Sequence, residues 1–123
     1  MVKKVCLDTD VCIEIIKNSD QGKMILNKIY DHEVSISSIT MFELLLRETN
    51  LSIIDKFFNR VEILEFNAPS SRIASQIFKN LKSSGKIIEI RDIFIASIAV
   101  SNNCELATLN KKHFDVISGL KVI

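Results

Sequence analysis

Three carboxylates and one amide in this sequence have the chemistry of a site for a divalent cation. Each stands at the boundary of an apolar run, and the four residues are Asp8, Glu43, Asp92 and Asn110. Carboxylate and amide oxygens are the ligands that Mg²⁺ and Mn²⁺ prefer in proteins. Gathered at one place, these side chains would form an oxygen-rich cage for a cation that activates water against a phosphodiester.

The site needs a scaffold that brings these four boundaries together, and the apolar pattern predicts one. Short apolar runs alternate with longer amphipathic segments. The predicted strands are 5–7, 34–37, 61–66, 104–107 and 120–123. The predicted helices begin near Val11, Gln21, Ile39, Asn50, Pro69, Asp92 and Lys111. We expect a three-layer α/β/α domain with a central, mainly parallel sheet of about five strands. The carboxyl ends of such strands share one crevice, which is the usual ligand site.

Size and charge fit a single globular domain spanning 1–123. The 123 residues are 47% hydrophobic and 25% charged, which excludes a disordered chain and allows a core without disulfides. The formal net charge is only +1. A strong nucleic-acid binder is often more basic, so any basic surface here must be local.

The cysteine pattern favours a reducing compartment. Cys6, Cys12 and Cys104 are odd in number and form no CxxC pair, so they are expected to be buried thiols. His32 and His113 lack the spacing of zinc ligands. No signal-peptide pattern and no apolar run of about 18 residues is present. We therefore expect a cytoplasmic protein without a membrane span.

Taken singly, each polar residue of the set has an ordinary structural explanation. Asp8, Asp92 and Asn110 could each cap a helix, and Thr40-x-x-Glu43 matches a capping box. The combination favours a site, because Asp8 and Asp92 adjoin strongly apolar segments where an unpaired carboxylate is costly. Clustered carboxylates also repel one another, and a cation removes that repulsion.

Four segments carry a resemblance to a known family. They read VCLDTDVCIEII, SISSITMFELL, RDIFIASIAV and LATLNKKHFDVISGLKVI. In order and spacing they resemble PIN-domain ribonucleases, above all the VapC toxins of VapBC toxin–antitoxin pairs. The resemblance covers essentially the whole chain and implies a PIN-like fold.

The resemblance also assigns roles to individual residues. It implies that Asp8, Glu43 and Asp92 are the catalytic, metal-binding acids, and that the hydroxyls of Thr9 and Thr108 orient the site. Asn110 stands where many members of the family carry a fourth acid. This departure leaves open whether one metal ion or two would bind.

The implied activity is Mg²⁺- or Mn²⁺-dependent endonucleolytic hydrolysis of RNA, with Asp8 or Asp92 helping to deprotonate the attacking water. The implied partners are a VapB-type antitoxin, which covers the crevice, and a second copy in a homodimer. Arg91 and Lys111 adjoin site segments and are the expected phosphate contacts. Asp10 could supply a missing charge, although we expect its side chain to point away from Asp8 or to cap the helix.

Two other functions remain open at this point. Asp8-Thr9-Asp10 resembles the nucleophile motif of haloacid-dehalogenase-type phosphatases, in which Asp8 would form a phosphoenzyme. That motif leaves Glu43 and Asp92 unexplained. The chain could also be a non-catalytic PIN-like module that binds RNA or a protein partner.

Overall fold

The computed structural model describes residues 2–123. Its strands are β1 (Lys3–Leu7), β2 (His32–Ser37), β3 (Glu62–Leu64) and β4 (Glu105–Ala107). Its helices are α1 (Thr9–Lys17), α2 (Asp20–Ile29), α3 (Ser38–Leu45), α4 (Leu51–Phe58), α5 (Ala68–Ser83), α6 (Ile90–Ser101) and α7 (Lys111–Phe114). Strands thus alternate with helices along the chain, as the sequence predicts.

The sheet is parallel throughout and has the order β3-β2-β1-β4. Leu7, at the end of β1, lies opposite Ile36 on one side and Ala107 on the other. The predicted fifth strand at 120–123 is reduced to one isolated parallel bridge between Leu106 and Val122. The α/β class and the parallel sheet are confirmed. Within residues 2–123 the sheet has four strands rather than about five.

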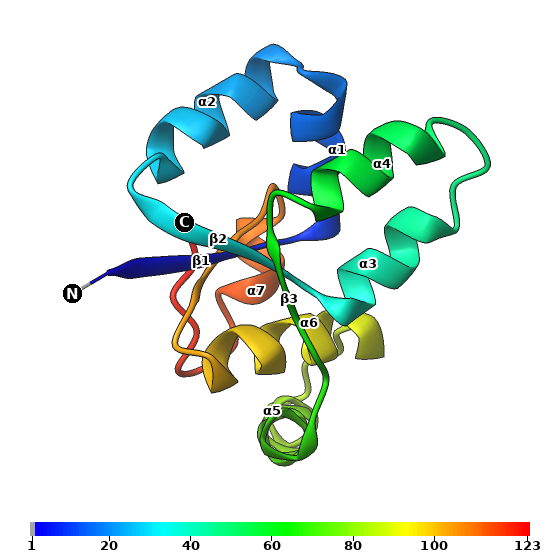
Figure 1. Cartoon of the computed structure of the whole chain (residues 1–123). Coiled ribbons are helices and arrows are strands. Elements are labelled where there is room, and N and C mark those ends of the chain that lie inside the picture. The colour runs from blue at the N-terminus through cyan, green and yellow to red at the C-terminus, as the bar shows by residue number, and fades with distance from the viewer. Residues whose placement is uncertain (1) are drawn as a thin grey trace.

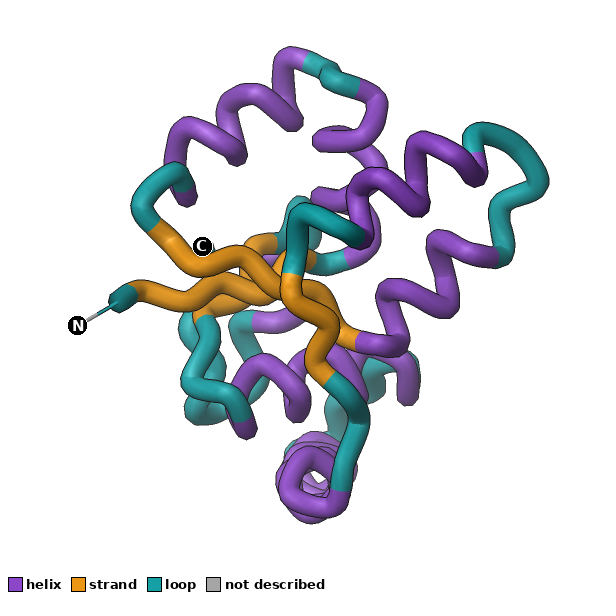
Figure 2. The backbone as a smooth tube through the Cα atoms, in the orientation of Figure 1, coloured by secondary structure: helices purple, strands orange, loops and turns teal. Residues whose placement is uncertain are grey.

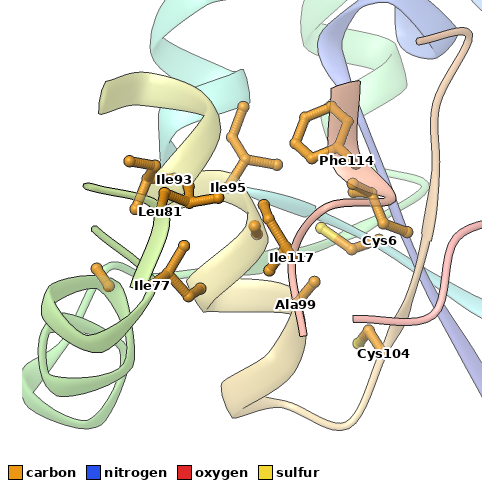
Figure 3. Close-up of a cluster of buried hydrophobic side chains, with 12 residues drawn as sticks. Cys6, Ile77, Leu81, Ile93, Ile95, Ala99, Cys104, Phe114 and Ile117 are labelled. Atoms are coloured by element: carbon orange, nitrogen blue, oxygen red, sulfur yellow. The ribbon is translucent and has the colours of Figure 1, made fainter. Parts of the chain in front are cut away.

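Helices cover both faces of the sheet, which gives three layers (Figures 1 and 2). Side chains alternate along β1, so that Val5 and Leu7 enter one core cluster and Cys6 the other. The first cluster lies under α1, α2, α3 and α4. The second lies against α5, α6 and α7, and α6 packs between the sheet and α5 (Figures 1 and 3). Burial on both faces explains why the strand sequences are almost continuously apolar.

Helix α3 begins differently from the prediction. Thr40 does not cap this helix, because the N-cap is Ser37, whose side chain accepts a hydrogen bond from the Thr40 backbone N–H at 3.0 Å. Thr40 is fully buried, one turn inside the helix. Ser37 ends β2 and starts α3 at once, so Glu43 lies two turns from the sheet edge rather than in a capping box.

Two further local features differ from, or add to, the sequence prediction. Asn50 precedes α4 in a left-handed conformation and makes no side-chain capping bond, so its capping role is not found. Gly22 in α2 lies so close to α1 that an added Cβ would be 2.4 Å from the Glu14 carbonyl oxygen. The absence of a side chain there lets the two helices pack closely. Among residues 2–123, no helix has the length and apolar character to cross a membrane.

Candidate metal centre

Asp8 lies where β1 ends and α1 begins, and both of its carboxylate oxygens are held by donors. Oδ1 accepts from the Thr9 backbone N–H at 2.8 Å, which makes Asp8 the N-cap of α1. Oδ2 accepts from the Thr108 hydroxyl at 2.8 Å, between the carboxyl ends of the paired strands β1 and β4. The residue is only 7% exposed. Two hydrogen bonds therefore fix the orientation of the Asp8 carboxylate. One comes from the next residue, Thr9, and the other from Thr108, which directly follows β4.

The environment of Asp8 disfavours its negative charge. Burial, followed by repulsion from Asp10, raises the Asp8 pKa from 3.8 to about 6. The hydrogen bonds from Thr108 and Thr9 oppose this rise, and the charge of Asp92 adds to it. A carboxylate that is buried among like charges gains stability when a cation is placed beside it. Asp8 thus has the electrostatics of a metal ligand.

Asp10 belongs to the same cluster: of the two predicted orientations, it does not point away from Asp8, but it does bond to a backbone N–H in the first turn of α1. Its Oδ1 accepts from the Val11 N–H at 2.7 Å and lies 3.5 Å from the Leu109 N–H. Burial is the main cause that raises the Asp10 pKa, and the charge of Asp92 also raises it. Asp10 also supplies the largest charge effect on Asp8. The amide Asn110 is therefore not the only source of additional oxygen ligands.

Glu43 reaches the site from the middle of α3. The Thr9 hydroxyl donates to Glu43 Oε1 at 2.9 Å and lies 3.1 Å from the Thr40 hydroxyl. The Arg91 guanidinium contacts Glu43 Oε2 at 3.1 Å. Arg91 also lies 3.6 Å from Glu89. The first turn of α6 therefore supplies a cation to the carboxylate on α3.

Asp92 and Asn110 lie at the starts of α6 and α7. Asp92 Oδ2 is 2.9 Å from His113 Nε2, and both side chains are about one-quarter exposed. Asn110 is exposed, and its backbone N–H donates to the Thr108 hydroxyl at 3.1 Å. Asn110 thus supports Thr108 through its backbone, while its amide side chain makes no capping bond to α7.

The set of oxygen donors fits Mg²⁺ or Mn²⁺, which favour carboxylate ligands. The charges of Asp10 and Asp92 raise the pKa of Asp8, and the charge of Asp92 raises that of Asp10. Within residues 2–123, no three His, Cys, Asp or Glu side chains are already arranged around one point as a finished metal cage. One oxygen of Glu43 is instead paired with Arg91, and one oxygen of Asp92 with His113. A cation bound by Glu43 therefore requires the pair with Arg91 to adjust, whereas Asp92 can keep its contact with His113 on Oδ2 and bind through Oδ1.

Comparison with known proteins identifies the family of this chain. The PIN domain model matches residues 5–120. This chain belongs to the PIN-domain family. It is 30% identical over 125 residues to the tRNA(fMet)-specific endonuclease VapC of Shigella flexneri, covering 96% of this chain and 95% of that protein. It is 42% identical over 95 residues to ribonuclease VapC3 of Methanocaldococcus jannaschii, covering 75% of this chain and 94% of that one.

Solved structures show the same relationship. VapBC2 from Rickettsia felis, bound to a DNA fragment from its promoter, matches with a TM-score of 0.87 and 30% identity, covering 100% of this chain and 98% of that chain. DNA-bound VapBC from Salmonella typhimurium matches with a TM-score of 0.87 and 29% identity, covering 99% and 98%. The resemblance noted in the sequence to VapC toxins is confirmed, and it extends over the whole PIN domain.

Hydrogen bonds connect the start of α1 with α3 and with the end of β4, and they connect the start of α6 with α3 and α7. The residues that these bonds join are Asp8, Thr9, Glu43, Arg91, Asp92, Thr108 and His113. Asn110 joins only through its backbone. Sequence reasoning missed the inward position of Asp10 and the contact between His113 and Asp92. The DxD spacing gave a signal for Asp10, whereas the His113 contact spans 21 residues and had no local signal.

Proposed function

We propose that this protein is a Mg²⁺- or Mn²⁺-dependent endoribonuclease and the toxin of a toxin–antitoxin pair. The observation that carries the proposal is the buried Asp8 carboxylate, whose pKa is raised to about 6 at the sheet edge where Asp10 and Asp92 also lie. The relatives that cover nearly the whole chain are named VapC endonucleases and ribonucleases. The acids and the family therefore support the same chemistry.

In this mechanism Asp8, Glu43 and Asp92 hold the cation, and Asn110 or Asp10 completes its oxygen shell. When bound, the cation lowers the pKa of water and offsets charge on the phosphate oxygens. The hydroxyls of the two threonines keep the carboxylates oriented, Thr108 on Asp8 and Thr9 on Glu43. The carboxylate of Asp8, or that of Asp92 through Oδ1, which has no partner within residues 2–123, would accept the proton of the attacking water.

RNA binding is assigned to the cationic residues beside the acids. Lys111 borders a mainly apolar cavity of about 210 Å³ that also includes Thr108, Leu109 and Lys28. Its ammonium group can contact a phosphate next to the scissile bond. Arg91 keeps donors that could do the same, but its charge is offset by the adjacent carboxylates of Glu43 and Glu89. We therefore expect Lys111 to contribute more to RNA affinity than Arg91.

The proposed partners follow from the same relatives. The similar structures from Rickettsia felis and Salmonella typhimurium are VapBC complexes, so we propose a VapB-type antitoxin that covers the acidic site. We further propose a homodimer and a cytoplasmic location, where the free thiols of Cys6, Cys12 and Cys104 stay reduced. Purification of the complex with the product of the neighbouring reading frame, followed by light scattering, tests both partners.

The decisive experiment is an RNA cleavage assay with Mn²⁺ on wild type and Asp8→Asn. We expect cleavage by the wild type, loss of at least about 100-fold in the variant and loss with EDTA. If the wild type binds RNA but leaves it intact with Mg²⁺ and Mn²⁺, the non-catalytic binding module is correct. The pairing of Arg91 with Glu43 is the observation that favours that alternative. A phosphatase with Asp8 as nucleophile is not supported, because the chain belongs to the PIN-domain family.

A further inference from the structure

The three predicted catalytic acids share one feature that the sequence did not show. Each accepts a hydrogen bond from a side-chain donor on a different segment of the chain. The pairs are Asp8 with Thr108, Glu43 with Thr9, and Asp92 with His113. The two threonines were expected to orient the site. His113 stands in the same relation to the third acid.

Asp92 depends on His113 more than the other acids depend on their donors. Asp8 is also held by the Thr9 backbone, and Glu43 by Arg91. Among residues 2–123, His113 is the one hydrogen-bond partner of the Asp92 side chain. The contact occupies Oδ2 and leaves Oδ1 without a partner in the described chain. One oxygen is thus fixed while the other stays available to a ligand.

His113 is itself held in place by the core. Its neighbour Phe114 is 1% exposed and packs with Cys6 and Ile117 in the cluster that α5, α6 and α7 share (Figure 3). The His113 ring meets the Phe114 ring edge to face, with centroids 5.5 Å apart and an angle of 89°. Its backbone N–H donates to the Asn110 carbonyl at 3.1 Å. These contacts limit the rotamers of His113 and aim Nε2 at Asp92.

We propose that His113 is a positioning residue for Asp92. The tautomer with its proton on Nε2 donates to Oδ2 and turns Oδ1 toward the cation. This inference rests on the proposed function, because it assigns the ligand geometry of the same site. Partners that orient ligand side chains in this way change metal affinity or activity by about 10–100-fold when they are removed.

The test compares variants that keep or lose the donor. In His113→Leu the side chain occupies a similar volume but has no hydrogen-bond donor. In His113→Gln the side-chain amide N–H can take the place of Nε2 and contact Asp92. Lys112→Ala is the matched control, because Lys112 is exposed on the same short helix. Calorimetry on the metal-free proteins measures Mn²⁺ affinity, and steady-state cleavage separates kcat from KM. Melting in EDTA shows whether each variant folds, and His113→Asn, whose amide is too short to reach Oδ2, replaces the leucine variant if that one is unfolded.

We expect His113→Leu to lower both Mn²⁺ affinity and kcat by about 10-fold or more while KM for RNA stays within about twofold. His113→Gln should recover most of both, and Lys112→Ala should match the wild type. Wild-type Mn²⁺ affinity and kcat in the leucine variant would overturn the proposal. So would an effect on KM alone, which would make His113 an RNA contact, or a glutamine variant no better than leucine. A wild type that neither binds Mn²⁺ nor cuts RNA would instead overturn the proposed function itself.

Discussion

Replacing Asp8 with asparagine should stabilise the metal-free protein while abolishing its activity. Folding forces this carboxyl to change its pKa from 3.8 to about 6, mainly through burial and repulsion from Asp10. At about 1.4 kcal/mol per pKa unit, the ionised side chain costs roughly 3 kcal/mol of folding free energy. Asparagine removes this cost. It offers one acceptor to the two donors Thr9 and Thr108, which returns about 1 kcal/mol of the gain. The expected net stabilisation is about 1–2 kcal/mol.

The stability difference between Asp8→Asn and the wild type should depend on pH. Because the Asp8 pKa is higher in the folded than in the unfolded state, the native state binds the proton more tightly. The wild type therefore becomes more stable as the pH falls from about 6 toward 3.8, and its deficit is complete above about pH 6. The advantage of the variant should be full at pH 8 and should shrink as the pH approaches 4.

Urea denaturation in EDTA at pH 8, 6 and 4.5 measures the effect. With a typical urea slope of about 1–3 kcal/mol per molar, the midpoint of Asp8→Asn should rise by roughly 1 M at pH 8. Asp55→Asn, on the exposed side of α4, is the control and should change little. Added Mn²⁺ should stabilise the wild type and not the variant. A variant that is no more stable at pH 8, or whose advantage is undiminished at pH 4.5, would refute the reasoning.

Three further changes test other parts of the structure. Gly22→Ala places a Cβ 2.4 Å from the Glu14 carbonyl oxygen. The free energy of unfolding should therefore fall by about 1–3 kcal/mol. An unchanged urea midpoint would contradict the close packing of α1 and α2. Arg91→Gln frees Glu43 Oε2 from a competing cation. Mn²⁺ affinity measured by calorimetry should rise, and a decrease would show that Arg91 instead helps to hold the site. Asn110→Asp adds a carboxylate at the position where many family members carry a fourth acid. Calorimetry should then show tighter Mn²⁺ binding or a second bound ion. An unaltered isotherm would place residue 110 outside the metal shell.

The sequence predicted those parts of the fold that depend on local pattern. Asp8 and Thr108 lie at the ends of apolar runs, and in a parallel sheet these ends meet, so their proximity could be expected before the structure. The alternation of short and long runs likewise predicted the layers. The run at 120–123 has the composition of a strand, but it meets the sheet through only one bridge, at Val122. Residue pattern does not show how much of an edge segment will pair.

Side-chain direction was the part that could not be predicted. Asp10 was expected to turn away from Asp8 or to cap the helix. It bonds to the Val11 N–H of α1, and the turn also places it against Leu109, where burial raises its pKa. The contact of His113 with Asp92 depends on how α7 packs on the core through Phe114. Such contacts follow from tertiary packing, and neither periodicity nor spacing contains that information.

The hydrogen bond between Thr108 and Asp8 joins residues 100 positions apart, and β1 lies between β2 and the late strand β4. A ribosome therefore finishes the acids at positions 8, 43 and 92 before it adds the donors that orient two of them. A growing chain that ends before β4 has one open side on its central strand and no Thr108 or His113. The order of synthesis thus delays assembly of the site until residues 108 and 113 have been made, and a fragment that ends before them lacks both donors.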